Sequence, residues 1–248
     1  MELKPRLKVI ADEIAGLGNQ DTVIDIGTDH AYLPILLIQQ NICTRVIATD
    51  IRSGPLNKAY VNVKKTSLED KIKLVCGDGL QAVPDNLTGS VVVMAGMGGI
   101  LLSKLVLAGL EKLRDVRMLI LQPMNSQEVL RQELVAMGVY IGYERLVQED
   151  RRVYNVLVCH VTDPTLIPGE GMFNPEPYAP EDYYIGKRHK DDDRELFIRH
   201  LKFVRRKISN RLGGLERSKD SAQGEEAVSL RGIIAGIDER ILQTSLGS

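Results

Sequence analysis

The chain has 248 residues, of which 44% are hydrophobic and 26% are charged, a balance that is typical of globular proteins and excludes wholesale disorder. Its apolar runs are far too short to span a bilayer, and its first residues lack the apolar region of a signal peptide, so we expect no membrane anchor or leader. Three widely spaced cysteines, Cys43, Cys76 and Cys159, argue against a disulfide framework and a zinc site, and favour a reducing cytoplasm. The net charge of −1, taken over the whole chain, argues against a nucleic-acid partner.

The charge is unevenly distributed along the chain. Residues 1–160 hold 18 basic and 18 acidic residues, whereas residues 161–186 hold five acidic residues, no basic ones and five of the ten prolines. Residues 187–217 hold eleven basic and five acidic residues, and residues 218–248 hold three and five. The near-zero total therefore hides one strongly basic segment, of the kind that attracts phosphates.

The first 160 residues alternate short apolar runs with amphipathic stretches. A helix is expected first, because Leu3, Leu7, Ile10 and Ile14 share one face. Buried strands rich in valine and isoleucine are expected at residues 22–26, 45–49, 72–76, 90–95 and 117–122. Helices are expected between them, at residues 33–40, 56–66, 101–113 and 126–137. This alternation predicts an α/β fold with a doubly wound parallel sheet.

The end of this region departs from the alternation. Residues 139–148 and 152–161 are two strand-like runs separated by only three residues, which predicts an antiparallel hairpin that closes the sheet. The proline-rich stretch that follows cannot continue a helix or a central strand, so we expect a linker or a docked irregular segment.

The C-terminal part has a helical period throughout. Apolar residues recur at alternating four- and three-residue steps from Phe197 to Leu215 and again from Ala227 to Ile241, with Gly213-Gly214 to Gly224 between them. This pattern predicts two helices paired as an antiparallel coiled-coil hairpin. We therefore expect a first domain at residues 1–162, a linker at 163–186 and a helical hairpin at 187–248.

Glycine and acidic residues follow the predicted strands, at the sheet edge where open α/β folds bind ligands. Gly27 permits a tight turn after the first strand, beside Asp25. Asp50 ends the second strand, where a carboxylate can accept both ribose hydroxyls of a nucleoside. Asp78 lies between two glycines after the third strand and suits an adenine amino group, although Gly-Asp-Gly is also an ordinary turn.

The fourth and fifth strands end in Ala95-Gly96-Met97-Gly98-Gly99 and in Gln122-Pro123. The glycines leave room for a ligand to pack on the backbone. Each motif alone is ordinary, but five consecutive strand ends of this kind predict one cofactor site. Its expected residues are Asp25, Gly27, Thr28, Asp29, Asp50, Ile51, Gly77, Asp78, Gly79, Ala95, Gly96, Met97 and Gly98.

Asp29 and Ala31 stand where the G-x-G-x-x-G pattern of NAD enzymes, and the usual methyltransferase G-x-G-x-G, prefer glycine. S-adenosylmethionine has no pyrophosphate to cradle against a helix N-terminus, so a methyltransferase tolerates this departure better. An NAD-dependent oxidoreductase or a small-molecule methyltransferase stays an alternative, although the basic hairpin has no purpose there. A non-catalytic RNA-binding or scaffolding protein is a further alternative, against which the intact strand-end motifs count.

Four motifs in order resemble those of the bacterial tRNA (adenine(22)-N(1))-methyltransferase family. The resemblance covers roughly residues 3–160 closely and the helical hairpin in general layout. It implies a Rossmann-like methyltransferase domain, S-adenosylmethionine as methyl donor, and N1 of an adenine in tRNA as acceptor. The motifs are Asp25-Ile26-Gly27-Thr28-Asp29-His30-Ala31-Tyr32-Leu33-Pro34, Gly77-Asp78-Gly79-Leu80, Ala95-Gly96-Met97-Gly98-Gly99 and Leu121-Gln122-Pro123.

Two positions depart from the family pattern. Met124 follows Gln122-Pro123 where asparagine is expected, and Asn155 follows Tyr154 where glutamate is expected. These departures weaken any role assigned to the two positions and leave the cofactor site intact.

Adenine N1 carries an in-plane lone pair, so the enzyme needs to supply positioning and to stabilise the positive charge that develops on the base. We expect Asp29 and His30 to be the catalytic candidates. Asp29 would accept a hydrogen bond from the adenine amino group, and His30 would orient Asp29 or contact phosphate. The alternative is structural, with Asp29 holding a turn and His30 an ordinary loop residue.

The acceptor tRNA has its own candidate residues. Tyr32 and Tyr154 are candidates for stacking on an extruded base, and Gln122, Pro123 and Asn125 for bordering its edge. The alternatives are a Tyr32 packed beneath the loop and a helix cap at Asn125. Further candidates, in the basic segment, are Lys187, Arg188, Arg205 and Arg206, which a solvated coiled-coil face would also explain. We expect no metal, and the sequence leaves the oligomeric state open.

Overall fold

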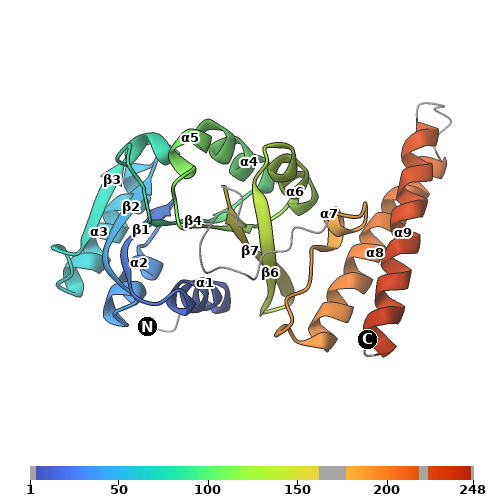
Figure 1. Ribbon diagram of the computed structural model, residues 1–248, viewed down its shortest axis with the longest axis horizontal. Helices are drawn as coiled ribbons and strands as arrows, with labels where there is room; N and C mark the ends of the chain where they lie inside the picture. Colours follow the sequence, from blue (N-terminus) through green and yellow to red (C-terminus); the bar gives the residue numbers. More distant parts are fainter. Residues whose placement is uncertain (1–3, 162–176, 218–222, 247–248) are drawn as a thin grey trace. The chain divides into compact units, whose positions relative to one another are not determined.

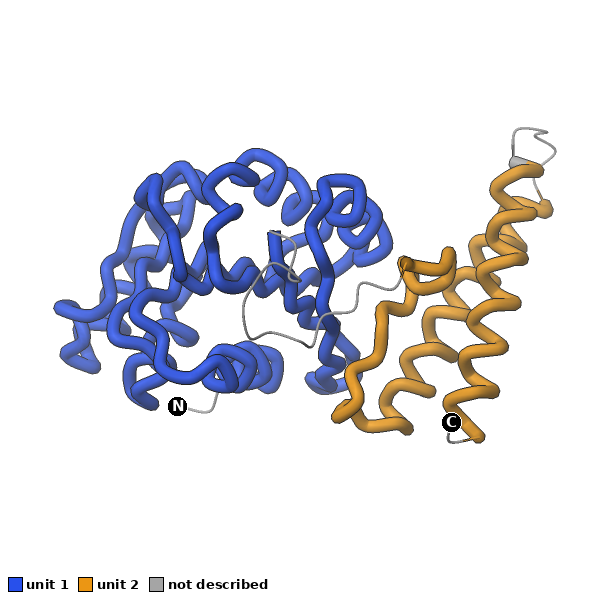
Figure 2. Tube along the Cα trace, viewed as in Figure 1, with its two compact units in different colours: residues 1–175 blue, residues 176–248 orange. Residues whose placement is uncertain are grey.

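The computed structural model describes residues 4–161, 177–217 and 223–246. It divides into two compact units, residues 1–175 (unit 1) and 176–248 (unit 2), which are coloured separately in Figure 2. Of the predicted linker at 163–186, residues 163–176 lie outside the described residues. None of the helices in the described ranges is long and apolar enough to cross a membrane.

Unit 1 contains a seven-stranded sheet with the strand order β3-β2-β1-β4-β5-β7-β6 (Figure 1). The first five strands pair in parallel, and β7 pairs antiparallel with both β5 and β6. The predicted doubly wound sheet with a closing antiparallel hairpin is therefore confirmed. The strands are β1 (Gln20–Ile26), β2 (Cys43–Asp50), β3 (Ile72–Cys76), β4 (Val91–Met97), β5 (Met118–Pro123), β6 (Tyr140–Glu149) and β7 (Arg152–His160).

Helices cover both faces of this sheet (Figure 1). Buried residues of α1 (Pro5–Gly16), α2 (Tyr32–Gln39) and α3 (Ser53–Lys65) form one continuous apolar core with the strands. On the other face lie α4 (Gly99–Ala108), α5 (Leu110–Leu113) and α6 (Gln127–Ala136), and a short 3-10 helix, η1 (Gly79–Ala82), follows β3. The central strands β1 and β5 are buried along nearly their whole length, and β4 is buried from Val91 to Met94, as their continuous apolarity predicts.

Two predicted helices differ in detail from the structure. The continuous helix expected at residues 101–113 is interrupted, since α4 ends at Ala108 and α5 begins at Leu110. Gly109 stands at this break against the Leu80 side chain, with no room for a Cβ. The helix expected at residues 33–40 is α2, which begins one residue earlier, at Tyr32, so that Pro34 is its third residue.

Unit 2 is a pair of 24-residue helices, α8 (Arg194–Arg217) and α9 (Gln223–Leu246), preceded by a short helix, α7 (Asp182–Ile185). Arg194 contacts the carbonyl of Thr244 at one end, and Arg211 pairs with Glu226 towards the other, so the two helices run antiparallel. The predicted helical hairpin is therefore confirmed. Helix α8 continues through Gly213-Gly214, which was expected to lie in the turn.

Helix α7 falls in the stretch expected to be a linker and is anchored to the hairpin. Asp182, which is buried, accepts hydrogen bonds from the Ala179 amide (3.0 Å) and from Arg240 Nη2 on α9 (3.1 Å). His200 Nε2 on α8 lies 3.0 Å from the Ile185 carbonyl oxygen. Residues 177–186 therefore belong to unit 2 structurally.

Candidate functional site

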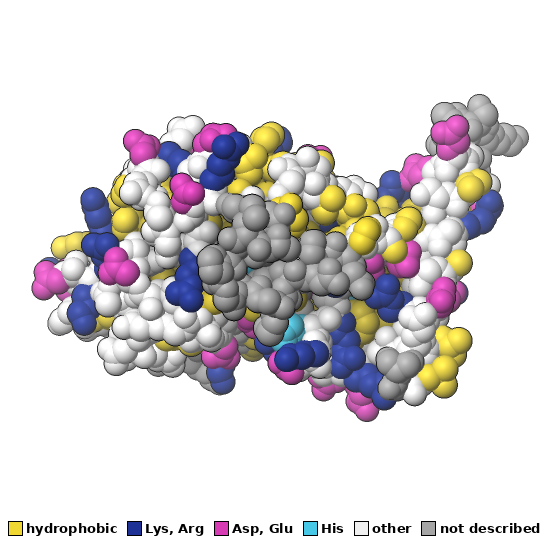
Figure 3. All heavy atoms as spheres, in the orientation of Figure 1, with side chains coloured by type: hydrophobic (Ala, Val, Ile, Leu, Met, Phe, Trp, Pro, Cys, Tyr) yellow, Lys and Arg dark blue, Asp and Glu magenta, His cyan; other side chains and the backbone are white. Residues whose placement is uncertain are grey.

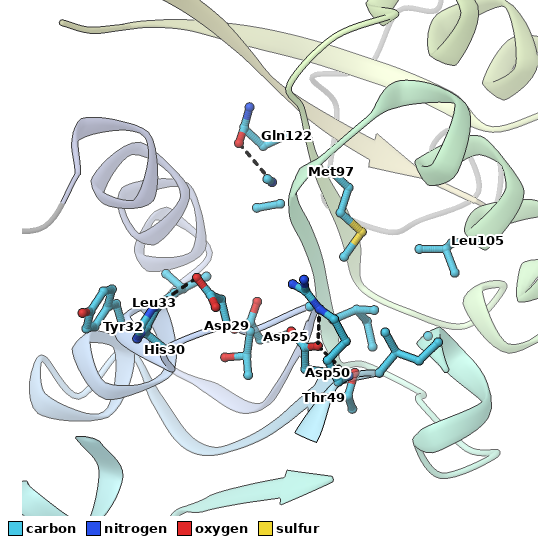
Figure 4. A pocket seen from close by; sticks show the side chains of 18 of the residues that line it. Asp25, Asp29, His30, Tyr32, Leu33, Thr49, Asp50, Met97, Leu105 and Gln122 are labelled. Atoms are coloured by element: carbon cyan, nitrogen blue, oxygen red, sulfur yellow. Dashed lines mark hydrogen bonds and ion pairs between the residues drawn. The ribbon is translucent and has the colours of Figure 1, made fainter. Parts of the chain in front are cut away.

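The carboxyl ends of the parallel strands surround a cavity of about 660 Å³ in unit 1 (Figure 4). Every predicted cofactor residue except Gly98 lines this cavity. The predicted residues Asp29, His30, Tyr32 and Gln122 line it too, whereas Pro123, Asn125 and Tyr154 do not. Residues that were not predicted also contribute: Lys4, Arg6, Leu7, Ile26, Leu33, Thr49, Arg52, Leu101 and Leu105.

The loop after β1 has an unusual backbone. Gly27, Asp29 and Ala31 have positive φ angles of 79°, 49° and 57°. The G-x-G-x-G pattern would place a glycine at each of these three positions. Asp29 and Ala31 therefore adopt the left-handed backbone conformation that glycine favours and that other residues rarely adopt. The amides of Gly27 and Thr28 donate to the Thr49 carbonyl of β2, at 2.7 and 2.8 Å, which fixes the loop to the neighbouring strand.

Gly27 is required by packing as well as by its φ angle. A Cβ at this position would overlap the Met97 terminal methyl, which reaches across from the end of β4. The ends of β1 and β4 therefore approach each other closely on the cavity wall, as Figure 4 shows for Met97 and the β1 residues.

Four carboxylates, those of Asp25, Asp29, Asp50 and Asp78, line the cavity. The pKa of Asp25 is raised to about 6, chiefly by burial and in smaller part by the neighbouring Asp50 charge, while the nearby Thr28 hydroxyl lowers it. Asp50 is also buried and accepts a hydrogen bond from the Arg52 amide (2.9 Å). Four carboxylates thus lie at the strand ends, and the basic side chains of Lys4, Arg6 and Arg52 line the same cavity, so it can take a ligand that carries both charges.

Asp29, His30 and Tyr32 form a small cluster on the cavity wall (Figure 4). His30 Nε2 lies 3.4 Å from Asp29 Oδ2, and the His30 ring stacks on the Tyr32 ring with centroids 5.1 Å apart. The Asp29 side chain is 59% exposed. Its carboxylate is therefore oriented by His30 and remains accessible from the cavity.

Gln122, expected at the edge of the acceptor base, is fully buried and bonded within the protein. Its Oε1 accepts hydrogen bonds from the Gly96 amide (3.1 Å) and from Arg6 Nη1 (3.4 Å), and its Nε2 donates to the Pro123 carbonyl (2.8 Å). In this arrangement Gln122 holds the Gly96 turn, which has a φ of 79°.

Arg6, from α1, is the main contribution that the sequence analysis missed. Its guanidinium lies over the Tyr154 ring (5.5 Å to the centroid) and 3.4 Å from Glu149 Oε2. Lys4 Nζ lies 3.9 Å from the same carboxylate group, at Oε1. The helical pattern placed Leu7, Ile10 and Ile14 on the buried face of α1, but Arg6 gave no signal that distinguished it from a solvent-exposed cation.

The two departures from the family pattern have structural partners. Met124 Sδ lies 2.7 Å from Arg6 Nη1. Asn155 is buried, and its Nδ2 donates to Glu144 Oε2 (3.1 Å). Glu144 in turn forms a two-pronged ion pair with Arg131, with both N–O distances 2.8 Å. Met124 thus contacts Arg6, which lines the cavity, and Asn155 contacts Glu144 of β6, whereas Tyr154 lies in the apolar core.

The predicted tRNA residues of the hairpin lie in unit 2. Lys187 Nζ lies 4.5 Å from the centroid of the Tyr178 ring, and Arg188 Nη2 donates to the Asp192 carbonyl (2.7 Å). Arg205 pairs with Asp238 of α9, whereas Arg206 is exposed on α8. Basic and acidic side chains are interspersed over the face of unit 1 that is seen in Figure 3.

No group of three or more potential metal ligands occurs among the residues that the structure describes. The three cysteines are free, with Cys43 and Cys159 buried and Cys76 exposed. The polar side chains that line the cavity include its four carboxylates, His30, and the basic groups of Lys4, Arg6 and Arg52.

Comparison with known proteins gives three related findings. The family described as "Methyltransferase domain" matches residues 3–157. The tRNA (adenine(22)-N(1))-methyltransferase of Bacillus subtilis is 33% identical over 163 residues, which cover 66% of this chain and 67% of that protein. A crystal structure of Sp1610 from Streptococcus pneumoniae, assigned as a tRNA (m1A22) methyltransferase, is 27% identical with a TM-score of 0.75, covering 97% of this chain and 100% of that one. The same protein in complex with S-adenosyl-L-methionine gives 26% identity, a TM-score of 0.75 and the same coverage.

Proposed function

The chain belongs to the tRNA (adenine(22)-N(1))-methyltransferase family, and from that premise we propose that it methylates N1 of an adenine in tRNA, adenine 22 by relation to its family. The main support for this proposal is the cavity of unit 1, in which the motif residues of five strand ends come together. The cofactor is S-adenosylmethionine, as in the family. The alternative of an NAD-dependent oxidoreductase is not favoured.

The residues of the cavity fit this cofactor. S-adenosylmethionine supplies an activated methyl group on a sulfonium, and it also carries an ammonium group. Four aspartates on the cavity wall complement these positive charges, whereas they would repel the pyrophosphate of a dinucleotide. Ala31, with a φ of 57°, precedes α2 where a dinucleotide site needs a glycine-rich anion cradle. Asp50 at the end of β2 would hold the ribose, and Asp78 the adenine.

Asp29 is proposed to act on the acceptor base. The N1 lone pair of adenine attacks without prior deprotonation, so the base becomes more positive as the methyl transfers. An accessible carboxylate that accepts a hydrogen bond from the base amino group stabilises this developing charge. His30 orients the Asp29 carboxylate at 3.4 Å, and Tyr32 supports the His30 ring by stacking.

Arg6 and Gln122 are proposed to shape the floor of the acceptor end of the cavity. A cation near a base that becomes positively charged would oppose the reaction if it were uncompensated. Glu149 lies beside both Arg6 and Lys4 and offsets their charges. Arg6 therefore serves as a support for Gln122 and the Gly96 turn.

The tRNA partner is proposed to contact unit 2 through its basic residues. Phosphates of the tRNA would bind to Lys187, Arg188 and Arg206. This contact would increase the affinity for tRNA, and the increase would become smaller as the salt concentration rises. Arg205 is removed from this proposed set by its pairing with Asp238. We place the protein in the cytoplasm, in keeping with its tRNA substrate and its three free thiols.

Methyl transfer to unmodified tRNA, followed by mapping of the modified base, tests the proposed function. We expect 1-methyladenosine at position 22, and calorimetric binding of S-adenosylmethionine in the absence of tRNA. Tight binding of NADH without binding of S-adenosylmethionine, or methyl incorporation only into a small molecule, would contradict the proposal.

A further inference from the structure

The basic residues of helix α8 lie on two sides of the helix, and their contacts differ between the two sides. On the side facing α9, Arg205 pairs with Asp238 and Arg211 with Glu226, and Arg194 contacts the last carbonyls of α9. These cations are neutralised within the hairpin and hold its two helices together. Eight basic residues and two acidic ones occur in α8, so the pairs leave a surplus of positive charge.

The surplus lies on the opposite side of the helix, which we call the outer face, defined by Lys202, Phe203, Arg206 and Lys207. The buried seam residues of α8 are Phe197, Leu201, Val204 and Ile208, and the outer-face residues lie between them in the helical period. All four are exposed. None of the three cations makes an ion pair or a hydrogen bond within the described part of the chain.

Phe203 is the unusual member of this face. Its side chain is 59% exposed, although the other phenylalanine of α8, Phe197, is 2% exposed in the seam. Phe203 is adjacent to Lys202 and lies one helical turn from both Arg206 and Lys207. The Phe203 ring is too exposed to contribute to the hairpin core. A face that served only to be solvated would carry polar residues and no large aromatic ring.

We infer that the outer face is a nucleotide-stacking site, in which an unpaired base of the tRNA stacks on the Phe203 ring and its flanking phosphates bind Lys202, Arg206 and Lys207. This inference rests on the proposed function. Proteins that bind single-stranded nucleic acid combine these two elements, an aromatic side chain for the base and a positive surface for the backbone. An acidic protein partner would satisfy the cations but would leave the exposed ring without a matching group.

Variants of Phe203 test the stacking directly. Phe203→Leu keeps an apolar, helix-favouring side chain and removes the ring, so we expect the Kd for tRNA to rise roughly 5- to 100-fold. Phe203→Tyr keeps the ring and should bind within about twofold of the original protein. Leu242→Ala on α9 is the matched control, since Leu242 is also 59% exposed, and it should leave tRNA binding unchanged.

The salt dependence of binding tests the cations. Lys202→Gln, Arg206→Gln and Lys207→Gln should each weaken binding and reduce the slope of log K against log salt by roughly 0.7 to 0.9. Arg205→Gln is the control within the same helix and should leave that slope unchanged, because Arg205 is paired with Asp238.

The outcomes separate this inference from the proposed function. If the original protein methylates no tRNA, the proposed function fails, whatever the variants do. If it methylates tRNA but Phe203→Leu binds tRNA as tightly as Leu242→Ala, the stacking site is refuted. If Phe203→Leu instead converts a dimer into a monomer in sedimentation of the protein alone, the outer face is a contact between copies and the inference is overturned.

Discussion

Two ion pairs, one in unit 1 and one in unit 2, are built in opposite ways. In unit 1, Arg131 and Glu144 are buried, with side-chain exposures of 0% and 1%, and Asn155 completes their hydrogen bonding. In unit 2, Arg205 and Asp238 are 42% and 47% exposed and meet in water. Removing one partner of the Arg131–Glu144 pair leaves a buried charge that water cannot solvate, so stability depends on this pair. Stability does not depend on the Arg205–Asp238 pair, because water can solvate either charge.

Breaking the buried pair should give the largest effect. Glu144→Gln leaves the Arg131 charge buried without its partner, so we expect the free energy of unfolding to fall by about 3–5 kcal/mol, measured by urea denaturation. The double variant Arg131→Met with Glu144→Gln should recover most of this loss. A loss below about 1 kcal/mol for the single variant would show that unit 1 does not depend on the pair.

Asp25 offers a pH test of burial in unit 1. Its pKa of about 6 lies above the ordinary value of 3.8. Between pH 3.8 and about 6, the folded protein without cofactor therefore keeps Asp25 protonated, whereas the unfolded chain does not. Stability should therefore fall as the pH rises from about 4 to about 6, by about 3 kcal/mol, and stay flat above. Asp25→Asn should abolish this loss and exceed the original protein in stability at pH 7 to 8. An unchanged pH profile in the variant would contradict the assignment to Asp25.

Asp29 tests whether the exposed carboxylate of unit 1 acts in catalysis. Asn tolerates the positive φ of this position, so Asp29→Asn keeps the loop and removes the charge. We expect kcat for tRNA methylation to fall about 100-fold, with the affinity for S-adenosylmethionine retained. Asp29→Gly, which also accepts the backbone, should behave the same way. Near-normal turnover in both would assign Asp29 to loop structure alone.

The exposed pair of unit 2 should give the smallest effect. Arg205→Gln removes one partner of a solvent-exposed pair, and the unfolding free energy should change by less than about 1 kcal/mol. Methylation of tRNA should also persist, in contrast to Arg206→Gln, which should raise the KM for tRNA. If Arg205→Gln and Arg206→Gln raised the KM for tRNA equally, the cations of the outer face would not differ from the paired cation Arg205.

The sequence predicted the sheet and most of the residues that line the cavity, because strand periodicity and the residues after each strand are local properties. It did not predict Arg6, which reaches Gln122 across 116 positions of sequence. Nor did it separate Arg205 from Arg206, since that needs the register of α8 against α9. Gln122 was expected at the edge of the base and lines the cavity, but the sequence did not predict that its amide also holds the Gly96 turn.

The strand order has a consequence for how the protein is made. Strand β7 is the last of the sheet to be synthesised, yet it lies between β5 and β6. During synthesis from the N-terminus, the outer edge of β5 stays open until residues 152–160 have emerged, and β6 has no neighbour in the sheet before then. Truncation before residue 152 would therefore leave β5 as an exposed apolar edge, a known template for aggregation. Helices α8 and α9 of unit 2 come later in the chain, so they are synthesised after the last strand of the sheet.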